Sequence, residues 1–416
     1  MKSLLRLSNL PGVLLLLAAI GFLGWINTNR ARQVSYISDL TQTLPLPIDA
    51  TSATGYAGGI RELIVPEHNN DSYQWLAQTQ QMLAHNEWRL RHVDYDNAPY
   101  GREIRTPSPY RWWLGFVASV DHKHTGQSLA LAVEQAALWS DPVLQIVLLV
   151  ITVIFTAWCF GPATASLLCL GFVTFFPFAS SFLPGQVDDY GLSLVGALWS
   201  ILPLLAGVNA LIPKPNETSR IARRWFVVAG IVGGLCLWLS VTREVPVLLG
   251  IGVGALVAAV TGRCDAKFPP LPWRAWALAG SVTTCVAFLA EYFPGHLALR
   301  EWRLETIHPL YAVAWLGAGE LLFCFQSWCR EAKPEWTRQR IVGAVIAVLA
   351  VASVPVAVLL NGDRTWLFAD AFAPRLTALS SSPVAGNTAA WLARDHFSGE
   401  IAATLLPLLF LFPALR

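Results

Sequence analysis

Apolar residues occur in repeated runs of about 20, separated by shorter polar segments, over most of the chain. A run of this length can cross the hydrocarbon core of a bilayer as an α-helix. The pattern predicts an all-α polytopic integral membrane protein with about ten transmembrane helices. The predicted spans are residues 1–27, 142–160, 163–182, 191–211, 225–241, 245–261, 275–293, 309–328, 341–360 and 399–414.

The first run follows Lys2 and Arg6, an arrangement also typical of a secretion signal. No small-x-small cleavage site follows it, so residues 1–27 are expected to be an uncleaved membrane anchor. Residues 28–141 are then expected to form a long exterior loop containing interfacial amphipathic helices. Residues 142–416 are expected to form the transmembrane helix bundle.

Lys and Arg predict the orientation of the bundle. They are concentrated in three alternate loops, PKPNETSRIARR, TGRCDAKFPPLPWR and WCREAKPEWTRQR. Cytoplasmic loops carry such an excess, so these loops are expected inside. Most carboxylates and all 8 histidines then lie outside. We expect an integral membrane protein, of the bacterial inner membrane, with its site on the periplasmic or exterior face.

Charged residues make up 13% of the chain, about half the roughly 25% of soluble domains, and the net charge is only +2. This balance and the lack of a basic tract argue against a nucleic-acid partner. The 7 cysteines fall in predicted spans or on the cytoplasmic side. They predict no disulfide framework and argue against an enzyme with an outward-facing thiol nucleophile.

The stretch EHNNDSYQWLAQTQQMLAHNEWRL predicts a helix start followed by an amphipathic helix. Asp71 stands at its beginning, where it either caps the helix or presents an oriented carboxylate, and the two roles can coexist. The apolar face is predicted to carry Trp75, Leu76, Thr79, Met82 and Leu83.

The next segment, Arg91 to Trp113, is predicted to be irregular. Its Asp94 and Asp96 are either turn residues or secondary site candidates. Glu244 follows Arg243 at a later exterior turn, where it is either another secondary site candidate or the partner of Arg243 in a salt bridge. A last exterior loop supplies Glu305 and His308 as secondary candidates, and Arg300 and Arg303, whose planar guanidinium groups suit phosphate oxygens.

The stretch LPGQVDDYG places adjacent carboxylates, Asp188 and Asp189, at the exterior mouth of the bundle. Pro184 and Gly185 predict a helix break just before them. A solvated acidic turn is common between two helices, but carboxylate oxygens are also the ligands that Mg²⁺ or Mn²⁺ requires.

The order of these features resembles the membrane half of the oligosaccharyltransferase catalytic subunit and, more broadly, the GT-C superfamily of glycosyltransferases. The resemblance rests on NDSYQW in the first exterior loop and on GQVDDYG at the next exterior mouth of the helix bundle. Tyr190 stands where the family has a second acid. The family's Trp-Trp-Asp-Tyr-Gly element is absent from the sequence.

The resemblance implies a GT-C-like fold and transfer of a sugar or oligosaccharide from a polyprenyl phosphate or pyrophosphate donor, with inversion at the anomeric carbon. It implies Asp71 as the catalytic carboxylate and Asp71, Asp188 and Asp189 as ligands of a divalent cation. Arg300 and Arg303 would contact the donor phosphate. The implied partners are the lipid-linked donor, the bilayer and an acceptor of unknown class.

Two other functions fit a polytopic chain of this kind. One is a transporter or flippase for a lipid-linked sugar, which predicts charged or broken helices near the bilayer midplane. The other is a lipid-linked-polymer ligase, which would also work on the exterior face and would depend more on exterior His and Arg than on Asp71.

Overall fold

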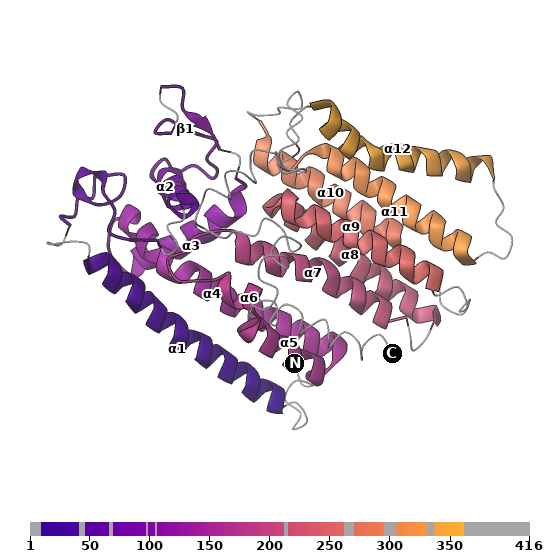
Figure 1. The fold of residues 1–416 in the computed structure, drawn as a ribbon, viewed down its shortest axis with the longest axis horizontal. Helices are drawn as coiled ribbons and strands as arrows, with labels where there is room; N and C mark the ends of the chain where they lie inside the picture. The colour runs from indigo at the N-terminus through magenta and orange to yellow at the C-terminus, as the bar shows by residue number, and fades with distance from the viewer. Residues whose placement is uncertain are drawn as a thin grey trace, which may run out of the picture. The chain divides into compact units, whose positions relative to one another are not determined.

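The computed structural model describes residues 10–40, 46–65, 70–96, 99–104, 106–211, 215–261, 270–294, 304, 306–330 and 337–361. Helices dominate these residues (Figure 1). They are α1 (Leu10–Leu40), α2 (Asn70–Ala84), α3 (Ser108–Thr125), α4 (Leu129–Phe160), α5 (Pro162–Thr174), α6 (Phe176–Ser180), α7 (Tyr190–Asn209), α8 (Pro215–Leu239), α9 (Val241–Thr261), α10 (Trp273–Tyr292), α11 (Pro309–Arg330) and α12 (Arg338–Asn361). A 3-10 turn, η2 (Ala57–Gly59), precedes α2, and an antiparallel hairpin, β1 (His92–Val93) and β2 (Arg102–Glu103), precedes α3.

Among the described residues, 8 helices are long and apolar enough to cross a membrane, namely α1, α4 and α7 to α12. The predicted all-α polytopic fold is therefore confirmed. The predicted span 163–182 forms two shorter helices, α5 and α6, because the backbone is extended at Phe175. Pro177 in the first turn of α6 has no N–H to continue the α5 hydrogen-bond pattern. The predicted span 399–414 lies outside the described residues.

Helices α1 and α4 are longer than their apolar runs. Helix α1 continues to Leu40, beyond residue 27, and α4 begins at Leu129, before residue 142. Neither added segment contains Gly or Pro, so nothing local ends the helix where the polar residues begin. Apolar runs indicate where a helix can meet lipid, and they do not mark where it stops.

The described residues divide into two compact units, one of residues 10–26 and 145–182 and the other of the described residues within 27–144 and 183–361. In the first unit, Gln145 at one end of its α4 segment donates to the Phe178 carbonyl of α6 over 3.3 Å. Phe172 of α5 stacks on Phe178 with ring centroids 5.1 Å apart. Every described candidate site residue belongs to the second unit.

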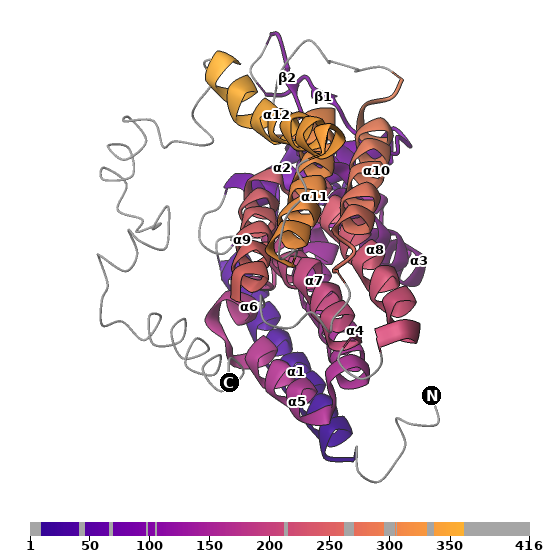
Figure 2. The same cartoon turned by 90° about the vertical axis from the view of Figure 1, so that its right-hand side faces the viewer.

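Helices α7 to α12 of the second unit pack side by side (Figures 1 and 2). Small residues permit the closest approaches, as is usual where lipid replaces water around helices. A methyl group at Gly230 or Gly234 of α8 would collide with α10, and one at Gly317 of α11 would collide with α12. Gly319 meets Ala277 of α10 in the same way, so the Gly-x-Gly beside Glu320 is a helix-packing site.

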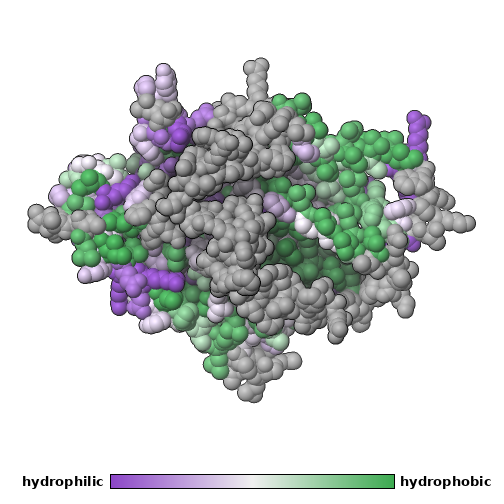
Figure 3. Space-filling model, viewed as in Figure 1, coloured by the Kyte–Doolittle hydropathy of each residue, from purple (hydrophilic) through white to green (hydrophobic). Residues whose placement is uncertain are grey.

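The outer surfaces of these helices carry large exposed apolar side chains, including Leu249 and Val253 of α9 and Val345 and Leu349 of α12. Figure 3 shows this apolar surface over the region of α10 to α12, while hydrophilic side chains gather over the β1–β2 hairpin. The contrast is that expected between a lipid-facing bundle and a solvated loop.

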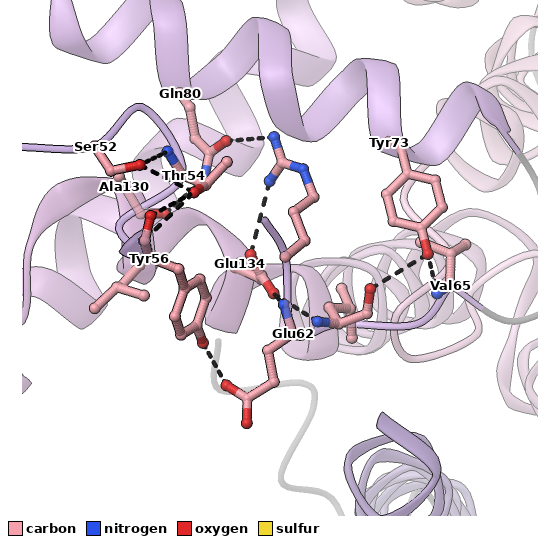
Figure 4. A network of polar contacts seen from close by, with 12 residues as sticks. Ser52, Thr54, Tyr56, Glu62, Val65, Tyr73, Gln80, Ala130 and Glu134 are labelled. Carbon is pink, nitrogen blue, oxygen red and sulfur yellow. Dashed lines mark hydrogen bonds and ion pairs between the residues drawn. The ribbon is translucent and has the colours of Figure 1, made fainter. Parts of the chain in front are cut away.

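Residues 46–65 are held to α2 and α4 by a polar network around Glu134 (Figure 4). The Glu134 carboxylate accepts the backbone N–H groups of Glu62 and Leu63 over 2.9 and 2.6 Å. Arg61 lies 3.7 Å from the same carboxylate and donates to Gln80, which in turn donates to the Ala130 carbonyl. The loop is thus an ordered platform, and it positions α2.

Candidate active site

The acidic turn before α7 is tied to two neighbouring helices. Asp188 Oδ1 accepts the Tyr190 N–H over 2.8 Å, and the Gly185 N–H donates to the Ala137 carbonyl of α4 over 3.0 Å. Gly185 has a φ of 80°, which is the left-handed region that glycine adopts without strain. The turn is therefore fixed in shape, with Asp188 at the start of α7.

Asp189 is paired with Arg243 from the first turn of α9. The Arg243 guanidinium lies 3.1 Å from Asp189 Oδ1 and 4.6 Å from the centroid of the Tyr190 ring. The expected salt bridge between Arg243 and Glu244 is therefore wrong. Glu244 points away into the bundle, where it is buried and accepts the Ser200 hydroxyl over 2.8 Å.

A buried acid, Asp141 of α4, supports Asp188. The Asp141 carboxylate accepts the backbone N–H of Asp188 and the Tyr110 hydroxyl, whose oxygen lies 2.8 and 2.9 Å from its two oxygens. Both Asp141 and Tyr110 are fully buried. Burial raises the pKa of Tyr110 well above its usual value, and the nearby Asp141 charge adds to the shift. Tyr110 is therefore a hydrogen-bond donor at any physiological pH.

The first turn of α3 joins several elements at this end of the unit. Ser108 donates its N–H and hydroxyl to Glu291 of α10 over 3.2 and 2.8 Å, and Trp238 of α8 donates to the same carboxylate over 2.8 Å. Tyr110 reaches Asp141, and Arg111 reaches Gln78 of α2 over 2.8 Å. One helical turn thus connects carboxylates of α4 and α10 to α2.

Arg111 is a buried cation with no carboxylate within ion-pair distance among the described residues. Its guanidinium donates to Gln78, to the Thr106 hydroxyl and carbonyl, and to Ser108, and it lies 5.5 Å from the Trp75 ring centroid. Burial lowers its pKa to about 10, and the Glu291 charge works in the opposite direction. Arg111 stays protonated and holds Thr106 and Gln78 in place.

The remaining predicted residues take local positions. Asp96 pairs with Arg102 over 2.8 Å, and Asp94 lies 3.2 Å from the His92 ring. His308 is buried before α11 and its Nδ1 accepts the Leu310 N–H over 3.1 Å; burial lowers the His308 pKa.

Four predicted site residues lie outside what the structure describes. Arg300, Arg303 and Glu305 fall in undescribed segments. Asp71 is the second residue of α2, and its side chain is not described. Its predicted neighbourhood with Asp188 therefore stays a prediction, as do the catalytic and phosphate-binding roles. The buried apolar face predicted for this helix is present, with Trp75, Leu76, Thr79 and Met82 buried.

The described residues alone do not complete a divalent-cation site. No group of three His, Cys, Asp or Glu side chains suited to a metal occurs among them. Asp189 is paired with Arg243, and one oxygen of Asp188 accepts the N–H of Tyr190, the first residue of α7. The predicted roles of Asp71, Asp188 and Asp189 as cation ligands therefore stay predictions.

Several residues of this site are not apparent from apolar runs. Asp141 was expected at the edge of a span, and a carboxylate inside the apolar helix ALWSDPVLQIVLL is the signal that marks it. Tyr110 and Arg111 lie in a segment predicted to be irregular, which instead forms a hairpin and the start of α3. Their burial comes from contacts with residues far along the chain.

Comparison with known proteins gives likeness in structure only, since no protein-family model and no curated protein matches the chain. Solved structures of an oligosaccharyltransferase from Archaeoglobus fulgidus are similar to it. The structure of AglB with an inhibitory peptide and a dolichol-phosphate has 14% identity and a TM-score of 0.49, and the match covers 86% of this chain and 39% of that one. The complex with zinc and sulfate has 15% identity and a TM-score of 0.46, covering 93% and 46% of the two chains.

This chain spans less than half the length of those proteins, at 39% and 46%. The likeness concerns the fold, and the roles of residues in this chain follow only from its own geometry.

Proposed function

We propose that the chain is a membrane glycosyltransferase that moves a sugar or oligosaccharide from a polyprenyl phosphate or pyrophosphate donor to an acceptor on the exterior face. The observation that carries this proposal is the arrangement around Asp188. A predicted-exterior carboxylate at a helix mouth is held in place by buried Asp141, which is in turn fixed by Tyr110 of the exterior loop. A solvated turn requires no such support.

In the proposed reaction an acceptor nucleophile attacks the anomeric carbon, the bond from that carbon to the phosphate oxygen breaks, and the configuration inverts. The acceptor proton passes to a carboxylate acting as general base, for which we propose Asp71. The lipid phosphate leaves with the bonding electron pair. Arg300 and Arg303 are proposed to contact that phosphate, because guanidinium groups bind phosphate oxygens in two-point contacts.

A divalent cation, Mn²⁺ or Mg²⁺, is part of the proposal only together with Asp71 and Asp188 as ligands. It would supply positive charge near the leaving phosphate. This chain's own contribution is to hold Asp188 at the mouth through the capped turn and the Asp141 contact.

The first test identifies the donor. The full chain is purified with its native lipid, the co-purified lipid is analysed by mass spectrometry, and that lipid is labelled in its sugar and offered in proteoliposomes with and without Mn²⁺. The proposal expects label to leave the lipid and appear on an acceptor. Movement of the intact lipid-linked sugar across the bilayer, with no transfer, would instead identify a flippase.

A further inference from the structure

A polar cavity of about 620 Å³ lies in the exterior loop between α2 and the β1–β2 hairpin. Its size falls within the range of about 300 to 1,000 Å³ usual for small-ligand sites. It belongs to neither the acidic turn nor the Asp141 contact. Most of its lining side chains are polar, chiefly Gln74, Gln78, Tyr95, Asp96, Arg102 and Thr106.

Gln78 is oriented with its amide nitrogen away from Arg111. Its Oε1 accepts from Arg111 Nη1 over 2.8 Å and from the Thr106 hydroxyl over 3.2 Å. Because a guanidinium only donates, the amide oxygen has to face Arg111. No described residue accepts a hydrogen bond from Nε2, although Gln78 is only 4% exposed and lines the cavity. This donor pair is therefore available to a ligand in the cavity.

Arg111 makes this donor rigid. The guanidinium is itself fully buried and fixed by Thr106 and Ser108. Rotation of the Gln78 amide would place its NH2 group against this cation and remove one acceptor from Arg111 Nη1, which is costly in a buried site. Binding groups held in one orientation lose little entropy when a ligand arrives.

The charge of the cavity excludes an anion as its preferred ligand. Its lining holds one cation, Arg102, and two acids, Asp96 and Glu103, so its formal charge is −1. Arg102 is moreover paired with Asp96 over 2.8 Å. A phosphate would meet net repulsion there. Hydroxyl groups both donate and accept, and they match a mixture of carboxamides, carboxylates, a guanidinium and the Tyr95 phenol.

We propose that this cavity is a saccharide site that binds a neutral, hydroxyl-rich oligosaccharide unit. The inference rests on the proposed function in that the sugar comes from the glycan of the lipid-linked donor or from a glycan acceptor. Position 78 falls two helical turns from position 71 of α2, and position 74 about one turn, so both share a face with it. The cavity thus lies on the face of α2 that also carries position 71.

The test is saccharide binding to the full chain in nanodiscs, measured by saturation-transfer NMR with soluble maltotriose, mannotriose and chitotriose. At least one of these is expected to bind. Gln78→Glu keeps an oxygen toward Arg111 but replaces the donor pair by a second oxygen, and it is expected to weaken binding about tenfold or more. Gln127→Glu, at an exposed position between α3 and α4, is the matched control and leaves binding unchanged.

Gln74→Ala provides a second variant, because Gln74 is exposed and its loss does not disturb the fold. This variant is expected to bind the same saccharide more weakly than the unchanged chain does. The inference is overturned if none of the three saccharides binds, if inorganic phosphate or pyrophosphate binds in their place, or if both variants bind as the unchanged chain does.

Transfer kinetics separate this inference from the proposed function. A higher KM for the lipid-linked donor in Gln78→Glu assigns the cavity to the donor glycan, and a higher KM for the acceptor assigns it to the acceptor. If the unchanged chain binds a saccharide but transfers no sugar, the saccharide site is supported and the proposed function is overturned. Transfer without saccharide binding, and with both KM values unchanged in Gln78→Glu, overturns the site alone.

Discussion

At the scale of single residues, the site depends on side chains that act through one another. Tyr110 fixes Asp141, Asp141 holds the backbone of Asp188, and Asp188 accepts the N–H of Tyr190 at the start of α7. A buried carboxylate is tolerated only when its oxygens are hydrogen-bonded. Each of these hydrogen bonds is therefore expected to contribute to stability as well as to function. Each can be removed by a substitution that changes the shape of the side chain little.

Tyr110→Phe removes one donor from Asp141. The buried carboxyl group then keeps only the Asp188 N–H as a donor, and we expect a loss of about 1 to 3 kcal/mol in the free energy of unfolding, with a lower transfer rate. Thermal unfolding in detergent and the transfer assay measure the two effects. Tyr100→Phe is the control, because Tyr100 is 83% exposed. Equal losses in both variants would contradict the account of Asp141.

His308 predicts a pH dependence. Its folded pKa lies below the ordinary 6.5 because burial disfavours the charged ring. The unfolded chain therefore binds the proton more readily, and the stability contributed by the neutral ring is present above pH 6.5 and lost as the pH falls below it. His308→Asn keeps an acceptor for the Leu310 N–H. Its melting temperature should fall less between pH 7 and pH 5 than that of the unchanged chain.

The sequence allows the prediction of residues that interrupt a local pattern and misses those that distant contacts make important. Asp188 is conspicuous because an acidic turn separates two apolar runs. Arg111 is not conspicuous, because the sequence RWW is equally typical of a surface segment. Its burial is apparent only from its contacts with Gln78 and Thr106. The pairing of Arg243 with Asp189 was missed for the same reason: 54 residues separate the two.

At the scale of helices, apolar runs predict the spans well because lipid selects them by length. They fail where local chemistry intervenes, as at Phe175, where a span predicted to be continuous becomes α5 and α6. Small residues determine how closely two helices pack. Composition alone does not predict which small residues lie at a helix contact. Gly230 and Gly234 of α8 lie four residues apart and both meet α10.

Gly230→Ala tests that packing. The added methyl would collide with the Trp276 carbonyl and Ala279 of α10, and overpacking of this kind costs about 1 to 3 kcal/mol. A lower melting temperature in detergent is expected. Gly250→Ala in α9 is the control, because no atom lies within 4 Å of the added methyl and alanine favours a helix. A melting temperature lowered equally by both substitutions would argue against close α8 and α10 packing.

At the scale of the whole molecule, the account requires the exterior loop and the acidic turn to share one side of the membrane. The positive residues of the alternate loops predict that orientation. Cysteine labelling checks it in a chain whose 7 cysteines have been replaced. Gln127→Cys should react with an impermeant maleimide in intact cells, whereas Gln339→Cys should react only after permeabilisation. The reverse result would place the proposed site on the cytoplasmic face.

The most direct measurement of the central claim compares sugar transfer by Asp188→Asn and Asp94→Asn in proteoliposomes containing the labelled lipid donor. Both substitutions neutralise one carboxylate, but Asp94 is 95% exposed on the hairpin and Asp188 is held at the bundle mouth. We predict that Asp188→Asn lowers the transfer rate at least about a hundredfold. Asp94→Asn should leave it within about twofold. Full transfer by Asp188→Asn, with donor binding unchanged, would contradict the account.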